Sequence, residues 1–430
     1  MKTIVPGILG LLFFLAQIYL TFNGLDYFSK YANPLALFLV SMAIALLYFY
    51  QQLQAPAGGA SRLLPLRAAP ALLWALAGAL TMVSGYEELR KLLVMYPNPG
   101  QYSDVLPQLE AQYHRFSRGE MPYAPVDLGY NAPYPVYMPL HWLPVGLSAG
   151  LGIDSRWAGY GLLVLAAGVY GYWIGRQNAP LAGRAAALFL PALGLWGFIL
   201  WGRLELPVSF ETVVAAYYLV LVAGLLGRHT GWITVGLIAC LLSRYTLIFW
   251  LPLLGYVLWT EQPRRVSARL WRNVALGILL LYVLPFLLRD PGIFATGIKY
   301  HNDGAVAQWI GQGDPPVSWS MEKGVYFGIN MKRWLPGDGA QQVLLARAVQ
   351  AAVMLLLLGF GFWACRRWKD QLDGYSLCLV MLYAMVGCFY FFSPMTFQYY
   401  YLVLFMLSAA AVAKMLITAS GGVQSAGPAA

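Results

Sequence analysis

The sequence predicts an all-α, polytopic membrane protein, and three observations lead to this fold class. Hydrophobic residues make up 60% of the 430 residues and charged residues only 11%, whereas a soluble domain carries roughly 25% charged residues. Apolar runs that approach the length a helix needs to cross a bilayer, about 20 residues, recur along the chain. The 15 Trp and 29 Tyr suit membrane interfaces. Soluble, disordered and disulfide-rich classes are therefore excluded, and the 4 cysteines, which lie in or beside apolar segments, predict neither a disulfide framework nor a zinc site.

Each of the clearest apolar runs is expected to form one crossing. The first follows only Lys2 and has no small-residue cleavage site, so we expect a retained helix rather than a signal peptide. Residues 1–50 form an N-terminal hairpin and residues 51–419 the core. The runs are Val5–Phe22, Pro34–Tyr50, Ala69–Tyr86, Trp157–Ile174, Ala185–Trp201, Pro207–Leu226, Val274–Leu288, Val343–Cys365, Tyr375–Phe392 and Tyr399–Thr418.

The stretch Gly231–Thr260 is too long for one crossing and carries Arg244 at its middle. Cytoplasmic loops are enriched in Lys and Arg, and the basic loops share one side only if this stretch crosses twice and turns near Arg244. About 12 crossings result, with both termini cytoplasmic. The net charge of +10 then divides into +11 on the cytoplasmic side and −1 on the rest of the chain. The charge therefore reports topology and not nucleic-acid binding. The same rule makes Met138–Ile153 an interfacial helix and not a span.

Two long outer loops remain, residues 87–156 and 289–342, and loops of this length are usually functional. The tail, residues 420–430, is small and polar and is expected to be disordered. In the first loop Val105, Leu109, Tyr113 and Phe116 recur at helical spacing, which predicts an amphipathic surface helix that ends at Arg118-Gly119. Ser103 is the expected N-cap, and Asp104 is expected in the first turn, where the helix dipole favours a carboxylate.

The order of motifs in this loop resembles that of integral-membrane glycosyltransferases of the GT-C class, and most of all glycosyltransferase family 87. In that family an Asp opens a surface helix, a Gly-x-x-Pro-Tyr stretch follows, and an aromatic, proline-rich stretch leads into the next helix. The corresponding stretches here are Asp104, Gly119–Tyr123 and Tyr134–Leu140. Leu242–Tyr245 and Ser393–Phe397 are similar to later family segments. Two adjacent prolines of the family, a Lys at Arg244 and a His near Tyr399 are replaced in this chain.

The resemblance implies an inverting transfer of mannose or another hexose or pentose from a polyprenyl-phosphate sugar to a glycan or glycolipid acceptor. We therefore expect the reaction to take place at the outer face of a bacterial plasma membrane, with membrane lipids as partners. It places the general base at Asp104, while the residue alone favours a helix start. No metal and no cofactor besides the lipid donor is expected. Alternative readings are a transporter or flippase of lipid-linked sugars, or a structural subunit.

Several other residues are candidates for substrate binding, and each has a structural alternative. Arg244 lies within a predicted membrane segment, where it can bind a donor phosphate or form an ion pair with Glu211 or Glu205. Glu211 can instead pair with Arg203 or bind a sugar hydroxyl. The cluster around Lys299, His301 and Asp303, together with His141, holds the donor phosphate or forms a solvated face. Aromatic side chains stack on sugars or anchor the loops at the interface; they are Tyr123, Tyr130, Tyr134, Tyr137 and the run Tyr399–Tyr401.

Overall fold

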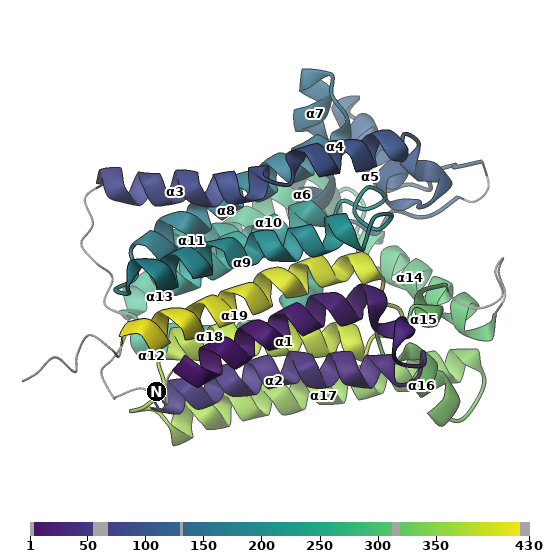
Figure 1. Cartoon of the computed structure of the whole chain (residues 1–430). Coiled ribbons are helices and arrows are strands. Elements are labelled where there is room, and N and C mark those ends of the chain that lie inside the picture. Colours follow the sequence, from purple (N-terminus) through teal and green to yellow (C-terminus); the bar gives the residue numbers. More distant parts are fainter. Residues whose placement is uncertain (1–3, 55–67, 130–131, 312–318, 422–430) are drawn as a thin grey trace, which may run out of the picture.

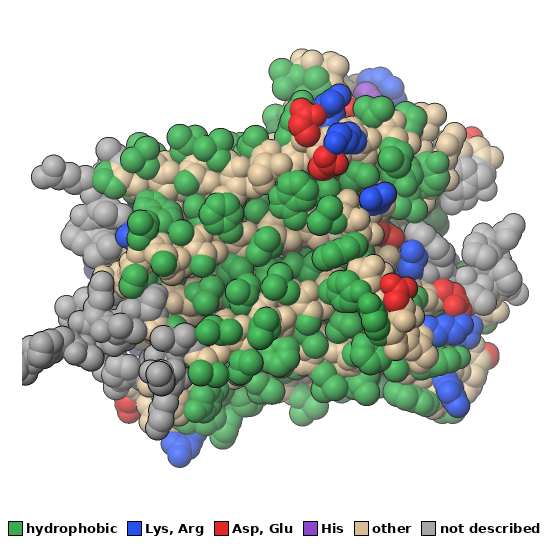
Figure 2. Space-filling model, in the orientation of Figure 1, with side chains coloured by type: hydrophobic (Ala, Val, Ile, Leu, Met, Phe, Trp, Pro, Cys, Tyr) green, Lys and Arg blue, Asp and Glu red, His purple; other side chains and the backbone are tan. Residues whose placement is uncertain are grey.

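The computed structural model describes residues 4–54, 68–129, 132–311 and 319–421, and every regular element in them is a helix (Figure 1). Most of the long helices lie side by side in one bundle. Hydrophobic side chains cover the middle of the face shown in Figure 2, and charged side chains gather at the end that carries α4, α15 and α16. The chain therefore has the surface of an integral, multi-pass membrane protein.

The first half of the bundle begins with the predicted hairpin. This half consists of α1 (Ile4–Asn23), η1 (Gly24–Asp26), α2 (Asn33–Gln54), α3 (Ala68–Val83), α8 (Ser155–Gly175), α9 (Leu181–Leu200) and α10 (Glu211–Gly227). Helices α3 and α8 pack with almost no side chain between them, because a Cβ on Gly171 would lie 2.4 Å from the Trp74 carbonyl oxygen. Small residues allow this close approach of two helices in a membrane.

The second half begins where α11 (Thr230–Leu241) ends and η3 (Tyr245–Leu247) interrupts the chain before α12 (Leu251–Glu261). The predicted turn near Arg244 is therefore present. The elements that follow are α13 (Arg264–Ile278), the π-helical η4 (Leu279–Leu287), α17 (Gly339–Arg367), α18 (Gly374–Phe391), η5 (Gln398–Tyr400) and α19 (Tyr401–Gly421). Helices α18 and α19 are almost entirely buried and form the centre of the bundle.

The two long connections contain short helices. The first holds α4 (Tyr86–Met95), η2 (Pro99–Gln101), α5 (Val105–Ser117), α6 (Pro139–Trp142) and α7 (Val145–Leu151); the second holds α14 (Ile293–Ile310), α15 (Trp319–Glu322) and α16 (Gly328–Trp334). These elements gather at one end of the bundle, on the right in Figure 1. We call this the loop end, and the opposite end the basic end because the arginine-rich first turns of α13 lie there.

The structure corrects three expectations and leaves the number of crossings open. The predicted single helix over Met138–Ile153 is two short helices, α6 and α7, separated at Leu143-Pro144. The segment expected from Val274 begins ten residues earlier, so the arginines of that basic loop are helical. Asp104 precedes the first turn of α5 and makes no capping bond, whereas the Oγ of Ser103, the expected N-cap, accepts from the Val105 backbone N–H. By length and composition, eight helices of the described residues can cross a membrane, so the expected count of about 12 crossings remains a prediction.

Candidate functional site

One large cavity, of about 580 Å³, lies at the loop end of the bundle. This volume is in the range of pockets that bind small molecules, about 300–1,000 Å³. Its walls come from the start of α5, the extended segment before α6, the break between α11 and α12, and parts of α14, α17 and α18 with the turn that follows α18. Segments more than 200 residues apart in sequence therefore share one cavity.

Asp104 lines this cavity from the N-terminus of α5. An Asp at this position normally accepts a hydrogen bond from a backbone N–H in the first turn of its helix, but the Asp104 side chain makes no such capping bond. Instead, the Oγ of Ser103 accepts from the backbone N–H of Val105, at 3.2 Å. Burial raises the pKa of the Asp104 carboxyl, and a side-chain hydrogen bond with Gln108 opposes that shift. The carboxylate is therefore free of helix capping and is a stronger base than a solvated Asp.

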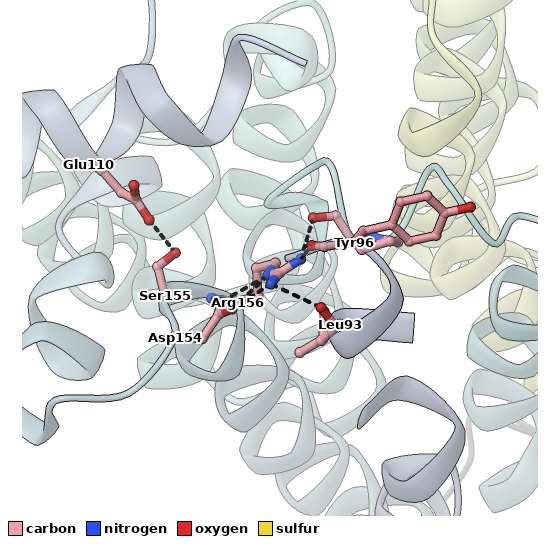
Figure 3. Close-up of polar contacts among 7 residues, drawn as sticks. Leu93, Tyr96, Glu110, Asp154, Ser155 and Arg156 are labelled. Carbon is pink, nitrogen blue, oxygen red and sulfur yellow. Dashed lines mark hydrogen bonds and ion pairs between the residues drawn. The ribbon is translucent and has the colours of Figure 1, made fainter. Parts of the chain in front are cut away.

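Polar contacts at the start of α8 hold both α5 and the end of α4 (Figure 3). The Oγ of Ser155, at the start of α8, donates to Glu110 of α5 at 2.7 Å. Next to it the nearly buried guanidinium of Arg156 is paired with Asp154 at 2.5 Å and donates to the Tyr96 carbonyl at 2.8 Å. The surface helix that carries Asp104 is thereby attached to the first turn of a bundle helix.

Arg244 lines the cavity in the break between α11 and α12. One of its Nη atoms donates to a carboxylate oxygen of Glu211 at 2.6 Å; Glu211 is buried and the Arg244 side chain is 14% exposed. The guanidinium lies 4.0 Å from the centroid of the Tyr400 ring. The ion pair with Glu211 is therefore the one that forms, and Arg203 is exposed and outside the cavity lining. The Nε of Arg244 is buried without a hydrogen-bond partner.

Arg347 is a cavity residue that the sequence reasoning missed. It lies about 12 Å into α17 at 1.5 Å per residue, and its Nε and one Nη atom are buried with no hydrogen-bond partner. No described acidic side chain forms an ion pair with it. An ionisable residue inside a predicted span is itself the signal that marks a functional candidate. Applying that rule to Val343–Cys365, as was done for Arg244, would have found it.

The second long connection contributes only part of its polar cluster. Tyr300 and His301 of α14 line the cavity, whereas Lys299 and Asp303 are exposed and lie outside the lining. Burial, with Arg347 and Arg244 nearby, lowers the pKa of His301 to about 4. His301 is therefore neutral at physiological pH and can donate or accept a hydrogen bond there, but it adds no positive charge.

Glu205 is the second carboxylate of the cavity and follows α9 in the connection to α10. Its side chain is 5% exposed, and burial raises its pKa to about 7 while Lys323 opposes the shift. The sequence reasoning considered Glu205 only as a partner of Arg244. In the structure it is a second carboxylate that can accept a proton in the same cavity.

The tyrosines divide between the cavity and the core. Tyr134, Tyr137 and Tyr399 line the cavity, and the Tyr399 ring stacks on Phe397 with centroids 5.3 Å apart. Tyr123 is buried against Phe286 and lies outside the lining. Tyr130 lies outside the described residues. The cavity therefore has an aromatic wall of the kind on which a sugar ring packs.

His141 lies behind the cavity wall, fully buried in α6, and its two ring nitrogens have no hydrogen-bond partner. Burial lowers the pKa of its imidazole well below the usual value. The preceding residue, Leu140, donates its backbone N–H to the Leu242 carbonyl at 2.8 Å, next to the helix break. His141 therefore lies under the segment that carries Arg244.

No protein-family model, no curated protein and no solved structure matches the chain. Among the described residues, no group of three or more His, Cys, Asp or Glu side chains has the geometry to hold a metal ion. The cavity brings together a carboxylate of raised pKa, an arginine with no ion-pair partner among the described residues, a neutral imidazole and an aromatic wall.

Proposed function

We propose that the chain is a glycosyltransferase that moves a sugar from a polyprenyl-phosphate donor to an acceptor hydroxyl, with inversion and with Asp104 as general base. One observation carries the proposal: Asp104, released from helix capping, shares a cavity with Arg347, whose charge no described acid balances. Such a cavity suits a substrate that brings an anion at one end and a hydroxyl at the other. The motif order that resembles glycosyltransferase family 87 specifies which substrate of this kind.

In the proposed step the acceptor hydroxyl transfers its proton to Asp104 as its oxygen bonds to the anomeric carbon of the sugar. The bond between that carbon and the phosphate oxygen breaks, and its electron pair leaves with the phosphate. A phosphodiester with one negative charge thereby becomes a monoester with about −1.5 to −2 charges at pH 7. A cation placed where charge develops lowers the barrier to such a step, and Arg347 is suited to this role because Glu211 already balances Arg244.

The cavity also reaches the surface where a lipid-linked donor would enter. Tyr245 lines the cavity within the helix break and is 40% exposed, and Ile248, three residues later, is 53% exposed. Both lie in a part of the chain flanked by apolar helices. A polyprenyl chain can therefore remain in the membrane while its phosphate reaches the arginines. A cavity without such an opening would suit a water-soluble donor instead.

The test is the release of polyprenyl phosphate by the purified chain from a panel of polyprenyl-phosphate hexoses and pentoses, with and without membrane glycolipid acceptors. Asp104→Asn changes the shape of the side chain little but cannot accept the proton. Because a positioned base contributes about 10²- to 10⁴-fold in rate, we expect turnover to fall by that factor while donor binding persists. Asp127→Asn is the matched control in the same loop, because the exposed Asp127 only accepts a hydrogen bond from the Gly129 backbone.

Glu205→Gln separates the two carboxylates of the cavity. A protonated Asp104 cannot act as a base, so wild-type turnover should fall as the pH drops through the raised pKa of Asp104. Glu205→Gln should keep most of the turnover and the same loss of activity in acid. Near-normal transfer by Asp104→Asn, or disappearance of the acid loss in Glu205→Gln, would assign the base to Glu205. Transport of intact donor across liposomes without sugar transfer would instead support a flippase.

A further inference from the structure

A second hollow, of about 520 Å³, lies at the basic end of the bundle between α3, α8 and α11. Its floor is formed by small side chains, Ala75 of α3 and Gly168 of α8, and its walls by Val169, Tyr172 and Trp232. We call it the α8 groove. It shares no residue with the cavity that contains Asp104, and the proposed function does not use it.

One cation, Arg176, lies at the end of the α8 groove, directly after the last turn of α8. Its guanidinium rests 5.1 Å from the Trp173 ring centroid, and one Nη atom donates to the Tyr172 hydroxyl at 3.3 Å. Its Nε is buried with no hydrogen-bond partner. No acidic residue lines the groove, and no described acid forms an ion pair with Arg176. A half-buried charge without a counter-charge is costly unless an anion meets it.

The surroundings of the α8 groove show from which medium that anion comes. Leucines of α3 and α8 that flank the groove are among the most exposed apolar side chains of the chain: Leu72, Leu76 and Leu165 are 57% to 67% exposed. On α11, Val235 is 52% exposed. Such a surface faces lipid tails in a membrane protein, so the groove opens to the bilayer and Arg176 marks its headgroup end. The neighbouring His229 also lines the groove. Its Nδ1 accepts from the Trp232 backbone N–H, so its other ring nitrogen is left for a ligand.

We propose that the α8 groove binds one anionic glycerophospholipid, with an acyl chain along Gly168 and Val169 and the phosphodiester on Arg176. Charge complementarity selects this occupant: the apolar walls fit a lipid tail, and the lone uncompensated guanidinium fits a negatively charged headgroup. One basic side chain at a headgroup surface favours an anionic lipid by about fivefold in affinity. The groove therefore discriminates headgroups and does not merely accept any lipid.

The test uses the full chain, stripped of lipid in detergent and titrated with phosphatidylglycerol or phosphatidylcholine of identical acyl chains, with native mass spectrometry to count bound lipids. We expect phosphatidylglycerol to bind about fivefold more tightly. Arg176→Gln should abolish this preference, while Arg366→Gln, which removes an exposed arginine from the last turn of α17, should keep it. Val169→Trp fills the groove from a half-exposed position and should weaken both lipids.

Three results would overturn the proposal. The first is equal affinity for the two lipids in the wild-type chain. The second is a headgroup preference that survives in Arg176→Gln; if that variant does not fold, binding of both lipids to Val169→Trp with wild-type affinity has the same meaning. The third is loss of the phosphatidylglycerol preference when inorganic phosphate is added at a concentration that leaves phosphatidylcholine binding unchanged, which would identify a free anion as the occupant.

Discussion

The ion pair between Glu211 and Arg244 allows a quantitative test. The structure shows what each side chain loses when the other is removed. Glu211 is 1% exposed and the Arg244 side chain 14%, and their charged groups lie 2.6 Å apart. Removing one member of a buried pair costs about 3–5 kcal/mol, since the other charge is left without compensation. Glu211→Gln keeps an oxygen that accepts from Arg244, so we expect a loss near the lower limit, about 3 kcal/mol.

The measurement is thermal unfolding of the purified variants in detergent. A loss of 1 kcal/mol lowers the melting temperature by about 2–4 °C in domains of 150–250 residues and by less in longer chains. At roughly 1–2 °C per kcal/mol, Glu211→Gln should melt about 3–6 °C lower. The double variant Glu211→Gln/Arg244→Met should recover part of this loss, because it leaves no buried charge unpaired.

The exposed pair of Arg118 and Glu120 is the matched control, since its side chains are 61% and 51% exposed. Glu120→Gln should leave the melting temperature nearly unchanged, because an exposed ion pair contributes little to stability. Polyprenyl phosphate should raise the melting temperature of Glu211→Gln more than that of the wild type, because only the variant has an uncompensated Arg244. The pair does not stabilise the break between α11 and α12 if Glu211→Gln melts at the same temperature as Glu120→Gln. The same conclusion follows if the losses in the double variant are purely additive.

Two further predictions concern the missed arginine and the topology. Arg347→Gln should weaken binding of polyprenyl phosphate at least tenfold. Gln341→Ala, which changes an exposed residue at the start of the same helix, should leave this binding intact. Equal binding by the two variants would show that Arg347 does not hold the phosphate. The topology is tested in a chain without its native cysteines. Asp303→Cys should react with an impermeant thiol reagent added outside intact cells, whereas Ala268→Cys, which is also exposed, should not. Labelling of Ala268→Cys from outside would contradict the orientation inferred from the basic loops.

The sequence alone predicted the helical class, the order of the bundle helices and the break at Arg244, since all three follow from local hydropathy and from charge along the chain. Apolar runs form helices in a membrane because every backbone group must be hydrogen-bonded within the segment. Helix ends were less well predicted. Hydropathy alone starts one helix at Val274, whereas α13 begins at Arg264 because the amphipathic, arginine-rich stretch before Val274 is helical too.

The make-up of the candidate site depended on tertiary structure. Asp104, Arg244, His301 and Tyr399 come from four separate segments, and no local pattern states that they line one cavity while Lys299 and Asp303 face away from it. The packing of α10, α17 and the helix break decides that Glu211 pairs with Arg244. The same packing leaves Arg347 without an acidic partner among the described residues. Local sequence determines where helices form, whereas which side chains meet is decided by packing between helices distant in the chain.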